Sequence, residues 1–412
     1  MVRFHGMSQP KSKPATSQSL PMIGVSWLML RLVLLLVVLT ASAGWPETHL
    51  EKELAAWPPG PSFGPWLQRV LIDPWLRWDT AYYLNIASRG YRLDDGTAQF
   101  HPLYPWTGRA AGYLLGGNIP AGLLLVSSVC GLLFLYGFER LARLDLPPAV
   151  ARRAALFFLH APLAFVLFAP YTESLFLLCS VTAFLMARRG AWWMAGIAGG
   201  LAVLTRQQGI FLLAPLGWEL WEWSGREWRK LAANWREAFS LALIPAGLLF
   251  WLAYRAITLG DVVFEVNRPQ TWIYGLMISN TAARVIPEQG FVAPWRALGA
   301  ALDHPRTTTR VDLILSSLFV LMLVLGGRFL WRLRPSYLLY SVVIILVSFS
   351  YFTGSWLPYM GLPRHCFLAF PLFLPLAAWA NGPKISLALV VVGLIGLILL
   401  AFFYSAHLVW VP

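Results

Sequence analysis

Charged residues are scarce in this chain of 412 residues. Only 12% are Asp, Glu, Lys or Arg, whereas soluble domains carry about 25%. Apolar and aromatic residues make up 58%, and many stand in runs of about 18 or more, the length typical of membrane spans. This composition excludes a soluble enzyme, a disordered chain and a coiled coil, and it predicts an all-α polytopic membrane protein.

Cysteine is rare as well, and several catalytic motifs are absent. Three scattered cysteines make neither a disulfide framework nor a metal cluster, and we expect buried thiols at Cys130, Cys179 and Cys366. The sequence has no Gly-rich phosphate loop with a lysine, no His-Glu-x-x-His and no Gly-x-Ser-x-Gly elbow. The pair Asp94-Asp95 either holds a divalent ion or stands at a turn before Gly96, and a lone pair favours the turn. We therefore expect no cofactor and no resident metal.

Apolar stretches predict about eleven membrane helices, within a range of roughly 9–12. They lie at roughly 22–45, 119–138, 154–170, 171–187, 191–205, 207–218, 238–258, 313–327, 336–353, 366–380 and 385–405. Polar inserts at Pro170–Glu173 and Arg206–Gln208 divide two longer apolar runs. Such breaks are tolerated at membrane depth where they line a cavity within the protein.

The positive-inside rule orients these spans. With the basic tail 1–21 inside and the sides alternating, the predicted inner segments hold seventeen basic and six acidic residues, which is +11 of the net charge of +13. This distribution explains the charge without a nucleic-acid partner. It predicts an inner N-terminus, one membrane domain over 22–405 with outer loops 46–105 and 259–310, and a short outer tail 406–412.

The first outer loop is expected to carry interfacial helices. Leu67–Arg92 has an aromatic face typical of a helix that lies at the membrane surface. Asp73-Pro74 is a suitable start for its second part. The segment 103–118, interrupted by Arg109 and two glycines, is predicted to be a re-entrant or surface element.

Five polar clusters fall on the predicted outer side, although only inner Lys and Arg residues decided the topology. They are Arg77-Trp78-Asp79, Phe100–Pro105, Tyr171–Ser174, Thr205–Gly209 and Pro363-Arg364-His365. Ionisable residues at membrane depth are rare and usually face a cavity or a partner. One outward-facing cavity, on which acids and bases converge, is the simplest account.

Each cluster also has a purely structural explanation. The alternatives are an ion pair of Asp79 with Arg77 or Arg89, a helix cap by Glu173, interfacial anchors at Arg206 and Arg364-His365, and a turn at His101. A carboxylate at a helix start is stabilising, whereas a cation there opposes the helix dipole. Five such coincidences on one face favour a functional site.

The polar residues of these clusters suit one kind of chemistry. Two carboxylates and several cations fit the transfer of a group to a hydroxyl from a donor whose leaving group is a phosphate. A carboxylate takes the proton of the attacking hydroxyl. Arginines hold the departing phosphate by bidentate, charge-assisted hydrogen bonds.

The same blocks resemble, in their order along the chain, the PIG-V family of GT-C mannosyltransferases. Arg77–Tyr91 followed by Phe100–Pro105 is similar to the family's first outer loop. The later similar elements are Tyr171–Ser174, Thr205–Gly209 and Pro363–His365, so that the resemblance spans roughly residues 70–375. Gln207-Gln208 departs from the family's usual pair, which leaves the acceptor open.

The resemblance implies a GT-C-like helical bundle. It also implies inverting transfer of mannose, or a similar hexose, from a polyprenyl- or dolichyl-phosphate sugar to a glycan or glycolipid hydroxyl on the outer or lumenal face. In eukaryotic members the product is an α-1,6-mannosylated GPI precursor. Asp79 is then the general base, and Trp78 shapes its surroundings. The other predicted substrate-binding residues are Arg206 and Arg364 for the phosphate, Glu173 and His101 for hydroxyls, and Tyr104, Tyr171, Gln207 and His365 from the same blocks.

Two other functions remain open. Broken helices and charges at membrane depth also serve a transporter or flippase of lipid-linked substrates, and a non-catalytic membrane scaffold is the third hypothesis. The sequence has no Asn-x-Ser/Thr site for N-glycosylation. This absence favours a prokaryotic cell membrane over the membrane of the endoplasmic reticulum.

Overall fold

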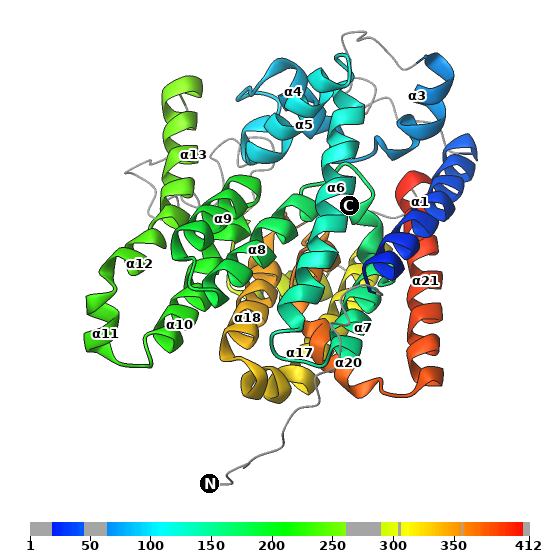
Figure 1. Ribbon diagram of the computed structural model, residues 1–412. Coiled ribbons are helices and arrows are strands. Elements are labelled where there is room, and N and C mark those ends of the chain that lie inside the picture. Colours follow the sequence, from blue (N-terminus) through cyan, green and yellow to red (C-terminus); the bar gives the residue numbers. More distant parts are fainter. Residues whose placement is uncertain (1–18, 45–63, 261–289, 304–305, 356, 407–412) are drawn as a thin grey trace.

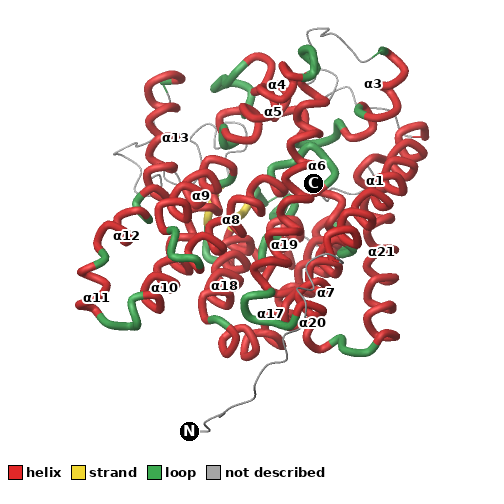
Figure 2. Tube along the Cα trace, in the orientation of Figure 1, coloured by secondary structure: helices red, strands yellow, loops and turns green. Residues whose placement is uncertain are grey.

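A computed structural model describes residues 19–44, 64–260, 290–303, 306–355 and 357–406 of the chain. Helices dominate this part of the protein (Figures 1 and 2), which confirms the all-α prediction. The predicted tails and parts of both long outer loops lie outside the described residues, so the predicted domain limits stay predictions.

The helices of the first half of the described chain are α1 (Ser19–Gly44), α3 (Pro65–Leu71), α4 (Thr80–Arg89), α5 (Leu103–Leu114), α6 (Ile119–Ala142), α7 (Pro148–Leu159), α8 (Glu173–Arg188) and α9 (Trp192–Thr205). Among them, α3, α4 and α5 lie at the upper end of Figure 1 and α6 and α8 at its centre. Short 3₁₀ helices connect several helices along the chain: η1 (Asp73–Trp75), η2 (Thr97–Gln99), η3 (Pro162–Leu167), η4 (Gln207–Leu212) and η5 (Phe370–Leu372).

The second half adds further helices and two very short strands. The helices are α10 (Leu213–Trp223), α11 (Trp228–Ala233), α12 (Trp235–Ser240), α13 (Leu243–Leu259), α16 (Pro294–Asp303), α17 (Thr307–Leu333), α18 (Pro335–Ser350), α19 (Leu362–Phe367), α20 (Phe373–Trp379) and α21 (Pro383–Ala406). Strands β1 (Gly290–Phe291) and β2 (Tyr351–Phe352) pair antiparallel, with Gly290 opposite Phe352. This pair joins residues 290–291, which precede α16, to the two residues that follow α18.

Five helical segments are long and apolar enough to cross a membrane: Met22–Gly44, Ile119–Ala142, Trp235–Leu259, Thr307–Leu333 and Pro383–Ala406. The chain is therefore an integral membrane protein. Helical structure also occupies the other predicted spans, but in shorter pieces. The number of about eleven spans stays a prediction.

Prolines and polar inserts explain why the shorter spans are broken. Helix α7 ends at Leu159, and η3 then begins at Pro162, whose ring has no N–H to continue a helical ladder. Pro371 opens η5 in the same way between α19 and α20. At Arg206, between α9 and η4, the backbone is extended, with φ −151°. These breaks bring polar residues and backbone groups into the interior of the bundle.

The prediction of a helix beginning at Asp73-Pro74 is wrong. These residues start the 3₁₀ turn η1, and α4 begins only at Thr80. The reason is Trp78, which has a left-handed backbone with φ +57°, a conformation that a right-handed helix does not contain. The segment 103–118 does form a surface helix, α5, which ends before Gly116 and Gly117.

Helices α4 and α5 lie together at the upper end of α6 in Figure 1. Glycine permits the contact of α5 with α6. A Cβ atom at Gly122 would lie 2.3 Å from the carbonyl oxygen of Gly108, well inside van der Waals contact. This close approach holds α5 tightly against α6.

Candidate functional site

Four charged side chains from distant parts of the chain form one connected ion-pair cluster, which we call the outer cluster: Asp79, Glu173, Arg206 and Arg364. Arg364 Nη2 lies 2.8 Å from Asp79 Oδ2, and Arg364 Nε lies 3.1 Å from Glu173 Oε1. Arg206 Nη1 lies 2.6 Å from the same Glu173 oxygen and donates a hydrogen bond to Thr172 Oγ1. Four of the five predicted polar clusters thus contribute to one network.

Each member of the outer cluster stands at an irregular point of the chain. Asp79 precedes the first residue of α4, and Glu173 is the first residue of α8. Arg206 occupies the extended break between α9 and η4, and Arg364 belongs to the short helix α19. Helix ends and breaks position these side chains, because they free the backbone from the regular helical path.

The outer cluster becomes less buried from Glu173 towards Asp79. The side chain of Glu173 is 0% exposed, those of Arg364 and Arg206 are 6% and 9% exposed, and that of Asp79 is 21% exposed. Buried charges are tolerated when partners compensate them. Two cations here face two carboxylates, and Asp79 is the carboxylate that an incoming molecule reaches.

The backbone next to Asp79 is strained, and the C-terminal helix supports it. Trp78 adopts φ +57°, which is unusual for a bulky residue and is typical of functional sites. Its indole Nε1 donates to the carbonyl of Tyr404 over 3.0 Å, and the Tyr404 hydroxyl donates to the carbonyl of Trp75 over 2.7 Å. Helix α21 thus holds the corner that orients Asp79.

Aromatic side chains lie beside Arg364 of the outer cluster. The guanidinium carbon of Arg364 lies 4.7 Å from the ring centre of Tyr171, a cation–π arrangement. Tyr83 packs edge-on against both Tyr171 and Tyr104. The Tyr104 hydroxyl donates to the carbonyl of Leu123. Tyr104 is therefore placed behind Tyr83 and joins α5 to α6, whereas Tyr171 touches the outer cluster directly.

The two predicted histidines and Gln207 lie around this cluster with unused polar atoms. Within the described chain, no hydrogen-bond partner is present for His101 Nδ1, His365 Nδ1 or Gln207 Nε2. The His101 ring lies 5.8 Å from that of Trp251. Burial lowers the pKa of His101 to about 3, so its imidazole is neutral at physiological pH and can accept or donate a hydrogen bond without a charge.

The acidic pair of the first outer loop serves a turn. Asp95 Oδ1 accepts hydrogen bonds from the backbone N–H and the hydroxyl of Thr97, and Gly96 between them has φ +77°. This geometry agrees with the turn interpretation of Asp94-Asp95. No group of three or more His, Cys, Asp or Glu residues suited to a metal occurs in the described ranges.

Gly209, three residues after Arg206, packs tightly against the end of α9. A Cβ atom there would lie 2.3 Å from the backbone nitrogen of Val203 and 2.4 Å from the carbonyl carbon of Ala202. We expect Gly209→Ala to push η4 away from α9, to displace Arg206, and to cost about 1–3 kcal/mol, as overpacking does. Thermal unfolding of the purified protein checks this expectation. Gly217→Ala is the matched control, because no atom lies within 4 Å of its added Cβ.

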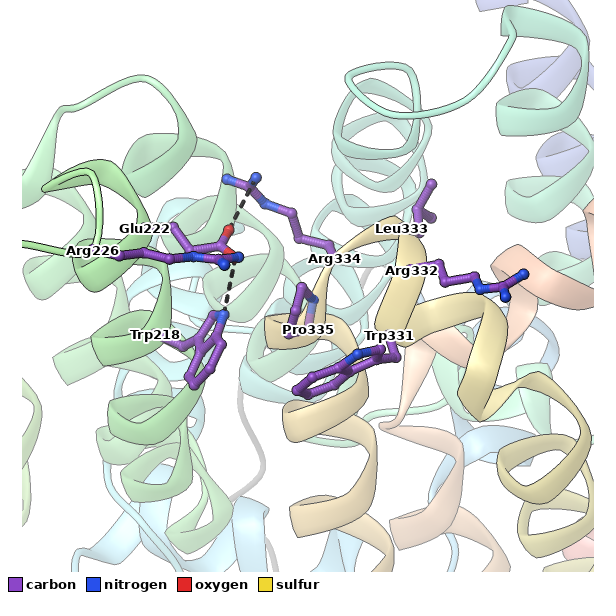
Figure 3. A pocket seen from close by; sticks show the side chains of 8 residues that line it. All are labelled: Trp218, Glu222, Arg226, Trp331, Arg332, Leu333, Arg334 and Pro335. Atoms are coloured by element: carbon purple, nitrogen blue, oxygen red, sulfur yellow. Dashed lines mark hydrogen bonds and ion pairs between the residues drawn. The ribbon is translucent and has the colours of Figure 1, made fainter. Parts of the chain in front are cut away.

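A pocket of about 580 Å³ lies elsewhere, between α10 and the turn that joins α17 to α18 (Figure 3). That turn is at the lower end of Figure 1, whereas α4 is at the upper end. Most charged groups of the pocket form ion pairs. Arg334 lies 3.1 Å from Glu222 and 2.8 Å from Glu219, and Arg226 lies 3.0 Å from Glu222. None of the sequence-predicted site residues lines this pocket.

Sequence reasoning missed two aromatic residues next to the site, Tyr404 and Trp251, and one buried acid, Asp312. Tyr404 and Trp251 stand in apolar helices, where nothing in a single sequence separates an aromatic site residue from a core residue. Asp312 was detectable, because it is an acid at the border of an apolar stretch. The predicted span 313–327 begins one residue after it, whereas α17 begins at Thr307, so Asp312 lies inside the helix.

Comparison with solved structures finds neighbours of low sequence identity, two of which were solved with a bound lipid phosphate. ArnT from Cupriavidus metallidurans bound to undecaprenyl phosphate shares 16% identity at a TM-score of 0.47, over 89% of this chain and 62% of that one. The oligosaccharyltransferase AglB from Archaeoglobus fulgidus, in complex with an inhibitory peptide and a dolichol-phosphate, shares 13% identity at a TM-score of 0.43, over 92% and 56% of the two chains. The chain thus spans about three fifths of the length of ArnT.

Comparison with protein families gives a direct assignment. A search of curated protein sequences gives no match. The model of the family described as mannosyltransferase (PIG-V) matches residues 25–253, which include the polar clusters from Arg77 to Gly209. This match covers more than half of the sequence and confirms the resemblance seen in the motifs. The chain belongs to the PIG-V family of mannosyltransferases.

Proposed function

We propose that the chain transfers a mannosyl unit, or a similar hexosyl unit, from a polyprenyl- or dolichyl-phosphate sugar to a hydroxyl group of a glycan or glycolipid. The observation that carries this proposal is the outer cluster, in a member of a mannosyltransferase family. Its accessible carboxylate, Asp79, lies in contact with a buried set of arginines. This transfer requires a base to take the proton of the acceptor hydroxyl and cations to stabilise the departing phosphate.

In the proposed step, Asp79 takes the proton from the acceptor hydroxyl. The hydroxyl oxygen then forms a bond to C1 of the sugar, and the bond between C1 and the phosphate oxygen breaks. The electron pair of the broken bond stays on the phosphate. Attack from the face opposite the phosphate inverts a β-linked donor into an α-glycoside. Phosphate leaves readily, so the step needs no strong general acid.

Arg206 and Arg364 supply the positive charge that the phosphate requires. The donor carries one negative charge as a phosphodiester, and the released lipid phosphate carries more. Guanidinium groups stabilise such oxygens by charge-assisted hydrogen bonds. In the structure both arginines are held by Glu173, which keeps them in place before the donor arrives. The neutral His101, with an unused ring nitrogen, is suited to a sugar hydroxyl.

The setting of the reaction follows from the predicted topology. We propose that the outer cluster faces the outer side of a prokaryotic cell membrane, since the basic inner segments orient the spans. Membrane lipids surround the protein, and the isoprenoid tail of the donor reaches the site from the lipid phase. The acceptor is a glycan or glycolipid of the cell envelope.

The donor is tested with the purified full chain in proteoliposomes. We expect label to move from polyprenyl-phosphate [³H]mannose to octyl α-mannoside, used as the acceptor probe. We expect no transfer from GDP-[³H]mannose, and release of the label by an α-mannosidase but not by a β-mannosidase. Transfer from GDP-mannose alone contradicts the proposal. Movement of the lipid donor between leaflets without transfer supports the flippase alternative instead.

A further inference from the structure

Helix α4 presents a row of accessible side chains that begins at the proposed base. The backbone carbonyl of Asp79 accepts hydrogen bonds from the N–H groups of Tyr82 and Tyr83, so Asp79 is in register with the helix. Asp79, Tyr82 and Asn85 follow at steps of three residues, which makes each the neighbour of the next on the helix surface. All three side chains are half-buried. We call these three residues the α4 row.

The other faces of α4 hold the helix in place. Tyr83, Leu84 and Ala87 are between 0% and 3% exposed. Tyr83 also packs edge-on against Tyr104 of α5, with ring centres 5.1 Å apart. Because α4 is anchored in this way, a side chain of the α4 row has a defined position relative to the base, as a binding site requires.

Phe100 orients the ring of Tyr82. The two rings are stacked, with centres 4.9 Å apart and planes at 26°. Phe100 is itself fixed, because it packs edge-on against Tyr83 and its carbonyl accepts a hydrogen bond from the hydroxyl of Tyr91. Tyr82 and Phe100 both remain half-buried. The Tyr82 ring is therefore held in one orientation before a ligand arrives, which lowers the entropy cost of binding.

The polar groups beside this ring are neutral and unused. Among the described residues, no hydrogen-bond partner is present for the hydroxyl of Tyr82 or for the side-chain amide of Asn85. Both groups can donate and accept hydrogen bonds. A pyranose presents C–H groups on the face of its ring and hydroxyls around its edge, so an aromatic ring flanked by such groups suits it. A lipid alcohol has neither the flat ring nor the neighbouring hydroxyls.

We propose that Tyr82 and Asn85 form the acceptor subsite and that its ligand is a pyranose ring, so that the acceptor is the end of a glycan and not a lipid alcohol. The inference rests on the proposed function, because it names the acceptor of that reaction. The sugar stacks on Tyr82, with one hydroxyl at Asp79 and another at Asn85. Tyr82 and Asn85 thus determine specificity for the acceptor and do not bind the lipid donor.

The test measures KM for octyl α-mannoside and for polyprenyl-phosphate mannose in the full chain. We expect Tyr82→Ala to raise KM for the mannoside by about tenfold or more, the loss of an aromatic contact, without changing KM for the donor. Asn85→Ala is expected to raise KM for the mannoside by about three- to tenfold, the loss of one hydrogen bond. Tyr82→Phe keeps the ring and is expected to retain most of the affinity. Tyr113→Ala, at an exposed tyrosine of α5, is the matched control and is expected to change neither constant.

A second arm tests the class of acceptor with 1,2-dioctanoylglycerol, whose hydroxyl belongs to no ring. We expect the wild-type kcat/KM for the mannoside to exceed that for the glycerol by about 100-fold or more, since a site built for hydrogen bonds rejects an analogue without them. Tyr82→Ala is expected to narrow this ratio. Thermal unfolding shows which variants are folded, and Asn85→Ala decides alone if Tyr82→Ala is not.

Three results overturn the inference while the proposed function stands. They are an unchanged KM for the mannoside in the folded variants, a raised KM for the donor instead, and equal wild-type rates with the two acceptors. A fall in kcat alone also overturns it, because it would show that Tyr82 only positions Asp79. If the wild-type chain transfers no sugar from the lipid donor to either acceptor, the proposed function fails, and the acceptor subsite fails with it.

Discussion

Replacing Asp79 by Asn is expected to lower the rate of mannosyl transfer by about 10²–10⁴-fold, the usual contribution of a general base. Asn keeps the shape of the side chain but cannot take a proton from the acceptor hydroxyl. Arg364 retains Glu173 as a partner, so the fold is expected to persist. Initial rates with labelled polyprenyl-phosphate mannose measure the effect, and thermal unfolding shows that the variant is folded.

Asp94→Asn is the matched control for this substitution. Asp94 lies between α4 and α5, is exposed and is expected to contribute nothing to the transfer. It also tests the alternative that the acidic pair holds an essential divalent ion. A low transfer rate in Asp94→Asn together with a wild-type rate in Asp79→Asn would indicate that the acidic pair is essential for the reaction. That result would contradict the assignment of Asp79 as the base.

Removing Arg364 is expected to damage both stability and transfer. The side chain contacts two carboxylates, and breaking a buried ion pair by removing one partner costs about 3–5 kcal/mol. We expect Arg364→Gln to lower the Tm by at least about 4 °C and to reduce transfer below detection. Unfolding in detergent micelles and the transfer assay measure the two effects separately.

Two further variants show whether geometry or charge alone matters at this position. Arg364→Lys retains the charge but has no planar fork to reach Asp79 and Glu173 together, so transfer is expected to stay low. Arg109→Gln removes an arginine whose side chain contacts the hydroxyl of Tyr113 at an exposed position, and we expect wild-type values. Full activity of Arg364→Gln would show that the outer cluster is structural only.

The fold class and the convergence of the polar clusters were predictable because charge is so scarce in this chain. An apolar sequence indicates where its helices lie, and an acid or a base inside it marks a place where a partner is needed. Glu173, Arg206 and Arg364 were identified in this way. The pairing of Arg364 with Asp79 was not predictable, because two residues 285 positions apart meet only after the helices have packed.

The errors have local physical causes. The expected helix from Asp73 fails at Trp78, which has a left-handed backbone and a side-chain hydrogen bond to Tyr404, 326 positions further along the chain. Helical periodicity has no signal for such a constraint. Asp312 was lost because helix limits taken from hydropathy end where the first charge appears. A hydropathy-based limit therefore excludes a buried acid that lies at the end of an apolar stretch.

The most direct test of the whole account is a structure of the protein with a phosphonate analogue of polyprenyl-phosphate mannose, which cannot be cleaved. We predict that the phosphonate oxygens lie within hydrogen-bond distance of Arg206 and that C1 of the mannose faces Asp79. Analogue bound in the pocket between α10 and the turn of α17 and α18, with the outer cluster unchanged, would contradict the account.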